Sequence, residues 1–160
     1  MSLGGGRSFG SSDFQRVYDE GLLLVAAAGN SGNTNRSWPA SESSVISVAS
    51  TNADNRHSSF SQYNNQVELA AFGKSSLSTL PNDRYGTKTG TSMASPVVAG
   101  VAAVVWSTYP QCTNVEIRNV LRATAVPCAG RPTTPNNFCG YGIVQAEAAV
   151  DYIAKTPNAW

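Results

Sequence analysis

The sequence is poor in charge and in long apolar runs, and each shortage excludes a class of partner. Charged residues make up 13% of the 160 residues, the formal net charge is +1, and lysine and arginine form no cluster. Because nucleic acid phosphates are bound by concentrated positive charge, we expect no nucleic acid partner. The longest apolar runs, residues 22–28 and 97–106, are shorter than the roughly 20 residues that cross a bilayer. We therefore expect no membrane partner.

Length and composition predict one globular domain. Hydrophobic residues make up 41% of the chain, which is ordinary for a protein that buries a core. Residues 1–14 contain neither the basic segment nor the apolar stretch of a signal peptide. We therefore expect no export signal within the chain.

Cysteine is scarce and odd in number, with residues at positions 112, 128 and 139. Cys128 and Cys139 bracket a polar loop with two prolines, which a disulfide would close at a gain of roughly 2–3 kcal/mol. The alternative is a pair of free thiols in a cytosolic protein. Cys112 then has no partner within the chain, so it is either free or bonded to another chain.

Strand-like and helix-like segments follow one another along the chain, which predicts an α/β domain with a sheet covered by helices. Residues 21–30 form a continuous apolar stretch typical of a parallel strand buried on both faces, and residues 44–50 alternate and are rich in β-branched side chains. Residues 97–106 are apolar on nearly every side, which predicts a helix buried through the core. Further helices are expected at 11–21, 113–125 and 142–153, short strands or turns at 67–72 and 77–80, and a hairpin turn at 81–86.

The segment 113–125 has the clearest helical pattern of the chain. Thr113 and Glu116 have the spacing of a capping box. The inner face is expected to consist of Val115, Ile117, Val120 and Leu121.

Ser92 is a candidate nucleophile because it lies where a loop turns into the apolar helix. A helix start offers free backbone N–H groups and the positive end of a dipole, which an oxyanion requires. Pro96, four residues later, has no N–H to offer to the Ser92 carbonyl, so the first turn is expected to be loosened there. The alternative for a Thr-Ser pair at a helix start is a plain N-cap.

Two other serine hydrolase patterns fail on the residues present. Residues 88–90 read KTG, as in penicillin-binding enzymes, but no lysine has a serine three positions before it. An α/β-hydrolase places its histidine after the nucleophile, whereas the single histidine, His57, precedes Ser92.

The stretch GTSMASPVVAG at residues 90–100 resembles the serine motif of the subtilases, the subtilisin and proteinase K family. Further resemblances lie in the family's order and spacing at SLGGG (2–6), AAAGN (26–30), SWPASE (37–42), RHSSFS (56–61) and CGYGIVQAEAAV (139–150). The resemblance implies a three-layer subtilisin-like α/β fold with a mainly parallel sheet, a buried nucleophile-bearing helix and an absent N-terminal part. Residues 1–160 would then be the C-terminal portion of a subtilase catalytic domain.

The resemblance also implies a catalytic role for two residues. Ser92 resembles the nucleophile that is acylated in a serine endopeptidase. Asn30 resembles the side-chain donor that binds the tetrahedral oxyanion together with the Ser92 backbone N–H. Without the other motifs, Asn30 would be interpreted as a turn residue.

Substrate-binding residues follow from the same resemblance. Ser2, Leu3 and Gly4 resemble the strand that pairs with a peptide substrate through main-chain hydrogen bonds. Ala27, Ala28 and Gly29 resemble the opposite wall of the first specificity pocket. Their small side chains predict a large apolar or aromatic residue before the scissile bond.

The resemblance leaves the catalytic aspartate and histidine unassigned. Subtilases carry the triad in the order Asp, His, Ser, and this chain begins after the point where the first two would lie. His57 is expected to be a surface or packing histidine. We therefore expect the catalytic Asp and His outside this chain, and the chain alone to be inactive.

Two departures from the family pattern concern Val97 and Asn52. Val97 stands where a histidine usually follows the motif's proline. Because that histidine is not a member of the triad, Val97 hardly weakens the resemblance. Asn52 stands where many relatives have an aspartate that helps to bind calcium. Because calcium favours charged oxygen ligands, the resemblance implies a site that is weakened or absent here, and we expect no other cofactor.

A chain that begins at the SLGGG strand is expected to expose a sheet edge at residues 21–28 and one flank of the central helix. The expected partners are a peptide or protein substrate and, over the exposed edge, the remaining N-terminal half or a second copy. The family and the Cys128–Cys139 pair imply an extracellular location. The alternatives are a non-catalytic subtilase fragment that binds peptides or partners through residues 2–6 and, less favoured, a purely structural fragment.

Overall fold

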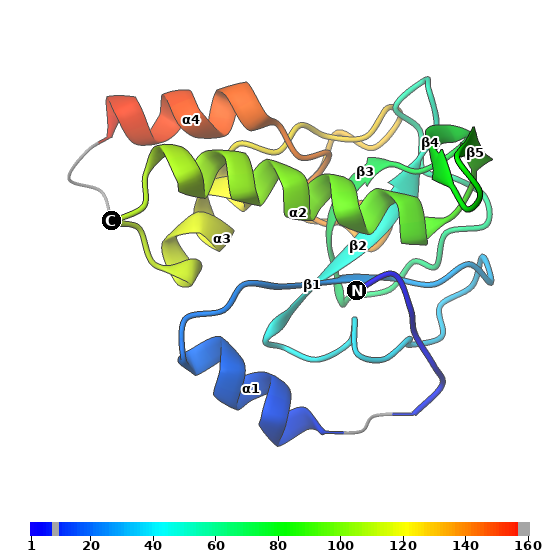
Figure 1. Cartoon of the computed structure of the whole chain (residues 1–160), viewed down its shortest axis with the longest axis horizontal. Coiled ribbons are helices and arrows are strands. Elements are labelled where there is room, and N and C mark those ends of the chain that lie inside the picture. The colour runs from blue at the N-terminus through cyan, green and yellow to red at the C-terminus, as the bar shows by residue number, and fades with distance from the viewer. Residues whose placement is uncertain (8–9, 157–160) are drawn as a thin grey trace.

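A parallel sheet between two layers of helices forms the centre of the computed structural model, which describes residues 1–7 and 10–156 (Figure 1). Within these residues the sheet contains β1 (Leu24–Ala27), β2 (Val45–Thr51) and β3 (Val67–Phe72), in the order β1-β2-β3 with both pairs parallel. The strands expected at 21–30 and 44–50 and the strand-or-turn segment at 67–72 are therefore confirmed as strands.

The helices divide between the two faces of the sheet. The helix α1 (Ser11–Asp19) lies on one side, where Phe14 packs against a cluster that contains Ala26 and Val45. On the other side lie α2 (Thr91–Thr108), α3 (Asn114–Ala123) and α4 (Ala146–Lys155), which share the largest core cluster with Ile46, Val48 and Leu69. The predicted α/β layering is thus confirmed.

The central strand β2 is buried along its whole length, at all seven residues. Its two sets of side chains enter different clusters, since Ile46 and Val48 face α2 while Val45 and Ala49 pack on the opposite side. The alternating pattern of residues 44–50 predicts one buried face. Whether the other face of β2 is also buried depends on the elements that pack against it.

The helix α2 packs against all three strands. We expected this helix to be buried on every side, but one of its faces is exposed. Thr91, Ala94, Ser95, Val98, Ala102 and Val105 form its buried face. On its opposite face Val97 and Val104 are 41% and 53% exposed. By length and apolar composition α2 would pass as a membrane span, a test that core helices also pass. The expectation of full burial was wrong because an apolar composition does not show whether other parts of this chain pack against each face of the helix.

The helix α3 begins with the predicted capping box. The Thr113 hydroxyl accepts a hydrogen bond from the Glu116 backbone N–H, and the Glu116 carboxylate accepts one from the Thr113 N–H. The expected inner face was wrong at Val115, which is 46% exposed, while Ile117, Val120 and Leu121 are fully buried. Val115 lies in the first turn, beyond the edge of the packed face.

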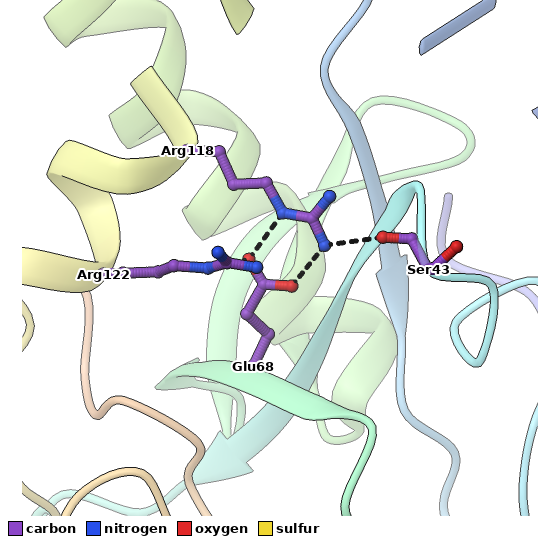
Figure 2. Close-up of polar contacts among 4 residues, drawn as sticks. All are labelled: Ser43, Glu68, Arg118 and Arg122. Carbon is purple, nitrogen blue, oxygen red and sulfur yellow. Dashed lines mark hydrogen bonds and ion pairs between the residues drawn. The ribbon is translucent and has the colours of Figure 1, made fainter. Parts of the chain in front are cut away.

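A buried ion cluster joins β3 to α3 (Figure 2). The Glu68 carboxylate accepts hydrogen bonds from Nε of Arg118 at 2.7 Å and from Nε of Arg122 at 2.8 Å. Arg118 also donates from Nη2 to the carbonyl of Ser43 at 3.0 Å. Burial alone would lower the pKa of Arg118, but the paired Glu68 carboxylate raises it above its ordinary value. Glu68 thereby fixes the position of α3 over the end of the sheet.

Two smaller elements complete the described chain. The strands β4 (Ser76–Leu80) and β5 (Arg84–Lys88) form an antiparallel hairpin, with Asn82 and Asp83 at positive φ in the predicted turn. Cys128 and Cys139 form a disulfide, as expected. Cys112 is free and buried, and burial raises the pKa of its thiol.

Candidate active site

Ser92 is the second residue of α2, at the helix end that faces the N-terminal segment of the chain. Its carbonyl lacks an N–H donor at Pro96, and the Ser2 hydroxyl donates to it instead at 2.7 Å. In return, the Ser92 hydroxyl donates to the Ser2 carbonyl at 3.1 Å. The expected loosening of the first turn is thus compensated by a residue far away in the sequence.

The plain N-cap alternative for this serine is wrong. The N-cap residue of α2 is Gly90, and no side chain caps the helix. The Ser92 hydroxyl donates to Ser2 and leaves the backbone N–H groups of the first turn to other acceptors. A helix start of this kind favours negative charge.

Asn30 is oriented by Thr91, the residue before Ser92. The Oδ1 atom of Asn30 accepts hydrogen bonds from the Thr91 backbone N–H at 2.8 Å and from the Thr91 hydroxyl at 2.9 Å. The same hydroxyl accepts a bond from the Gly29 N–H at 3.2 Å. With the oxygen so engaged, the Nδ2 atom of Asn30 stays available as a donor.

Gly90 keeps the space between Asn30 and Ser92 open. A Cβ atom at this position would lie 3.3 Å from Nδ2 of Asn30 and 3.6 Å from the backbone nitrogen of Ser92. Gly90 has a φ of +156°, within the range that favours glycine. A side chain at position 90 would therefore crowd the amide of Asn30, and the backbone conformation there favours glycine.

A cavity of about 370 Å³ lies beside these groups. Of the predicted site residues, six line it: Leu3, Gly4, Ala27, Gly29, Asn30 and Ser92. Ser2 and Ala28 do not line it. Ser2 is engaged with Ser92, and Ala28 is buried with its N–H bonded to the Val48 carbonyl at 2.9 Å.

Thr91 and Gln62 belong to the site, although no motif predicted them there. Gln62 lines the cavity, and a Cβ atom on Gly29 would lie 1.8 Å from its Oε1 atom. A larger residue at position 29 would displace the Gln62 side chain, and the φ of +111° at Gly29 also favours glycine. The contact of Thr91 with Asn30 spans 61 positions, so no local pattern in the sequence reveals it.

The N-terminal segment is held at both ends beside the cavity. The Ala27 N–H donates to the Met1 carbonyl at 3.0 Å, so the segment starts as an extension of the sheet beside β1. Gly5 and Trp38 exchange two backbone hydrogen bonds of 2.9 Å. Between these anchors the Leu3 side chain is 61% exposed and lines the cavity.

Comparison with known proteins accounts for this arrangement. A sequence profile of the subtilase family, peptidase S8, matches residues 1–142. The chain belongs to the subtilase family. Its relatives in that family are serine proteases.

Individual relatives cover most of this subtilase chain. Subtilisin BL from Lederbergia lenta is 43% identical over 129 residues, which are 81% of this chain and 46% of that protein. Alkaline elastase YaB from Bacillus sp. strain YaB is 41% identical over 153 residues, 93% of this chain and 39% of that protein. The chain therefore spans less than half the length of these two curated relatives.

A solved structure confirms the subtilisin-like fold. The psychrophilic subtilisin-like protease Apa1 from Pseudoalteromonas sp. AS-11 superposes with a TM-score of 0.85 at 21% identity, over 98% of this chain and 70% of that one. At this identity the likeness concerns the fold alone.

The single histidine of this subtilase chain lies in an aromatic cluster and does not line the cavity. The His57 ring packs edge-on against Phe138 at 5.2 Å and Tyr63 at 6.1 Å between centroids, and its Nε2 atom is buried without a hydrogen bond partner among the described residues. Desolvation lowers the pKa of His57. His57 is thus a packing histidine.

The side chain of Asn52 closes a turn. Its Oδ1 atom accepts hydrogen bonds from the backbone N–H groups of Asp54 at 3.1 Å and Arg56 at 3.0 Å. Among residues 1–7 and 10–156, no group of three or more His, Cys, Asp or Glu side chains is placed to hold a metal ion.

Proposed function

We propose that this chain carries the nucleophile and the oxyanion hole of a serine endopeptidase. The observation that supports this most is the orientation of Asn30 by Thr91, which leaves an amide donor beside Ser92 at the start of α2. A turn residue without a catalytic task needs no such fixed amide. The chain would be the C-terminal portion of the catalytic domain.

In the proposed reaction, Oγ of Ser92 attacks the carbonyl carbon of the scissile peptide bond. The oxyanion that forms accepts hydrogen bonds from Nδ2 of Asn30 and from the Ser92 backbone N–H, and the α2 dipole favours its negative charge. Collapse of the tetrahedral intermediate releases the amine product and leaves an acyl ester on Ser92, which water then hydrolyses.

Proton transfer is the step for which we propose that this chain needs help. The Ser92 hydroxyl donates to a backbone carbonyl, that of Ser2, and the single histidine is packed among aromatic rings elsewhere. A serine without an adjacent base is a weak nucleophile at neutral pH. We propose that the catalytic aspartate and histidine come from residues outside this chain, and that the chain alone is inactive.

Peptide binding is proposed to use the walls of the 370 Å³ cavity. The backbone of Leu3 and Gly4 would pair with the substrate main chain, while Ala27 and Gly29 would leave room for a large apolar or aromatic side chain before the scissile bond. Ser2 and Ala28 would contribute by holding these walls in place.

We also propose that a partner covers the exposed face of α2. The exposed face of α2 carries apolar side chains, Val97 and Val104 among them, and apolar side chains that gather on one face mark interaction surfaces. The N-terminal half of the domain is the proposed occupant, and a second copy is the alternative. The Cys128–Cys139 disulfide supports an extracellular location for the protein.

Labelling with a fluorophosphonate tests the proposal directly. The chain alone is expected to be labelled slowly at Ser92, and labelling and peptidase activity are expected to rise together when the segment that bears the aspartate and histidine is added. Ser92→Ala should abolish both. Ser107→Ala, at the exposed far end of α2, is the matched control and should change neither.

One outcome would favour the non-catalytic alternative. If Ser92 stays unlabelled in the assembled protein while an unlabelled peptide still binds the cavity, the enzyme proposal fails and a peptide-binding role through residues 2–6 replaces it. Loss of binding in Leu3→Ala would then locate the peptide.

A further inference from the structure

Ser92 lines two cavities, and the second is chemically unlike the first. This second cavity of about 400 Å³ lies between the β4–β5 hairpin and the start of α2. Residues of both elements line it: Ser76, Leu77, Ser78, Thr79, Lys88, Ser92, Met93, Pro96 and Val97. Ser92 is the only residue that the described linings of this cavity and of the Asn30 cavity share.

The proposed reaction assigns a different part of the substrate to each cavity. Asn30, Leu3 and Gly4 line the first cavity, so the residue before the scissile bond would occupy it in the proposed reaction. The acyl chain and the leaving amine are different substituents of the attacked carbon, and we infer that the residue after the scissile bond extends toward the hairpin cavity, which Ser92 also lines.

Lys88 is the only charged residue among the described residues that line the hairpin cavity. It is the last residue of β5, directly opposite Ser76 on β4, and its side chain is exposed. No ion pair to Lys88 occurs within residues 1–7 and 10–156. The remaining walls are hydroxyl-bearing residues of β4 and apolar side chains of α2, and none of them bears a negative charge.

We propose that Lys88 determines specificity on the leaving-group side and selects substrates with an acidic residue directly after the scissile bond. An unpaired ammonium beside the departing amine attracts a carboxylate on that residue, whereas it repels lysine or arginine. The selection rests on the proposed peptidase function and deepens it.

The test uses the peptidase assembled from this chain and the segment that supplies the aspartate and histidine. Three internally quenched peptides carry Phe before the scissile bond and Glu, Gln or Lys after it. Since exposed ion pairs contribute little, we expect kcat/KM to be about two- to fivefold higher for Glu than for Gln. This ratio should fall toward one in 1 M salt, where the Debye length is about 3 Å.

Charge variants distinguish the effect of Lys88 from an effect of the protein's net charge. Lys88→Gln should bring the ratio of kcat/KM for the Glu peptide to that for the Gln peptide to about one. Lys88→Glu should make the Lys peptide a better substrate than the Glu peptide. Lys74→Glu is the matched control, because Lys74 lies just before β4 and outside this cavity, and it should preserve the ratio.

The outcomes distinguish the two levels of the hypothesis. Cleavage of all three peptides with no preference for Glu, or a preference that Lys88→Gln leaves intact, overturns the role of Lys88 while the peptidase function stands. If the assembled protein cleaves none of the peptides, the proposed function fails and the role of Lys88 fails with it.

Discussion

Thr91 donates both its backbone N–H and its hydroxyl to the same oxygen of Asn30, at 2.8 and 2.9 Å. This double contact decides which end of the Asn30 amide faces Ser92. We therefore expect Thr91, the residue before the proposed nucleophile, to act by positioning Asn30.

Thr91→Val should impair turnover and leave substrate binding nearly intact. The substitution removes the hydroxyl that holds Asn30 and Gly29, so the oxyanion donor loses its fixed direction. Loss of one such hydrogen bond corresponds to roughly a tenfold decrease in kcat. Steady-state kinetics of the assembled peptidase would measure the decrease, with KM changed little.

The conservative variant Thr91→Ser keeps the hydroxyl and should retain most of the turnover. If Thr91→Ser is as impaired as Thr91→Val, or if KM rises while kcat holds, then Thr91 does not act through Asn30.

Glu68→Gln should destabilise the fold strongly. The substitution leaves the Arg118 guanidinium buried without its counter-charge, since both side chains are only 8% exposed. Removing one partner of a buried pair costs about 3–5 kcal/mol. Urea denaturation followed by circular dichroism would measure the loss in the free energy of unfolding.

An exposed pair in the same chain provides the comparison. Arg16 and Glu20 form an ion pair on α1 with side chains 62% and 55% exposed, and Glu20→Gln should cost less than about 1 kcal/mol. Equal effects of Glu68→Gln and Glu20→Gln would contradict a structural role for the buried cluster.

Acidification should destabilise the protein partly through His57. Desolvation lowers the pKa of His57 below 6.5 in the folded state, and the nearby Arg131 opposes a second positive charge next to Phe138 and Tyr63. The unfolded chain therefore binds more protons than the folded one just below pH 6.5, so stability falls as the pH decreases from 6.5 toward the folded pKa.

Thermal unfolding between pH 5 and pH 8 would reveal this contribution when the unaltered chain is compared with His57→Phe. The variant keeps an aromatic ring but cannot be protonated, so its melting temperature should depend less on pH in the acidic half of the range. Identical pH profiles would show that His57 is not the group responsible.

Loss of the Cys128–Cys139 disulfide should lower the free energy of unfolding by roughly 3 kcal/mol, as expected for a closed loop with a sequence separation of 11. The double substitution Cys128→Ser/Cys139→Ser, studied by urea denaturation, would measure it. A reducing agent should reproduce the loss in the unaltered chain and have no further effect on the double variant. If it destabilises both equally, the stabilisation does not come from this bond.

Sequence patterns sufficed to predict most of the helices and strands and to select Asn30 and Ser92, which the fold brings to one cavity. Ser92 and Asn30 lie in motifs whose order along the chain specifies a fold, and the capping box at Thr113 depends on neighbours only three positions away. Such local and motif-borne features can be recognised without coordinates.

Contacts between distant positions were not accessible in this way. The Ser2 hydroxyl reaches the Ser92 carbonyl across 90 positions, and Glu68 meets Arg118 across 50. Neither contact can be predicted from a periodic sequence pattern, because each depends on how two distant segments pack. The exposed face of α2 shows the converse limit, since an apolar residue such as Val104 looks the same in sequence whether or not this chain covers it.

The hydroxyl that Ser2 offers to Ser92 also has a consequence for the order of folding. A helix normally closes its first turn with its own backbone, within nanoseconds to microseconds, but at Pro96 that donor is missing. The turn that bears Ser92 is completed only when the beginning of the chain has docked, and long-range contacts of this kind form late. We therefore expect the first turn of α2 to stay incomplete in a partly folded chain, and the orientation of the Ser92 hydroxyl to be acquired only after residues 1–2 have docked.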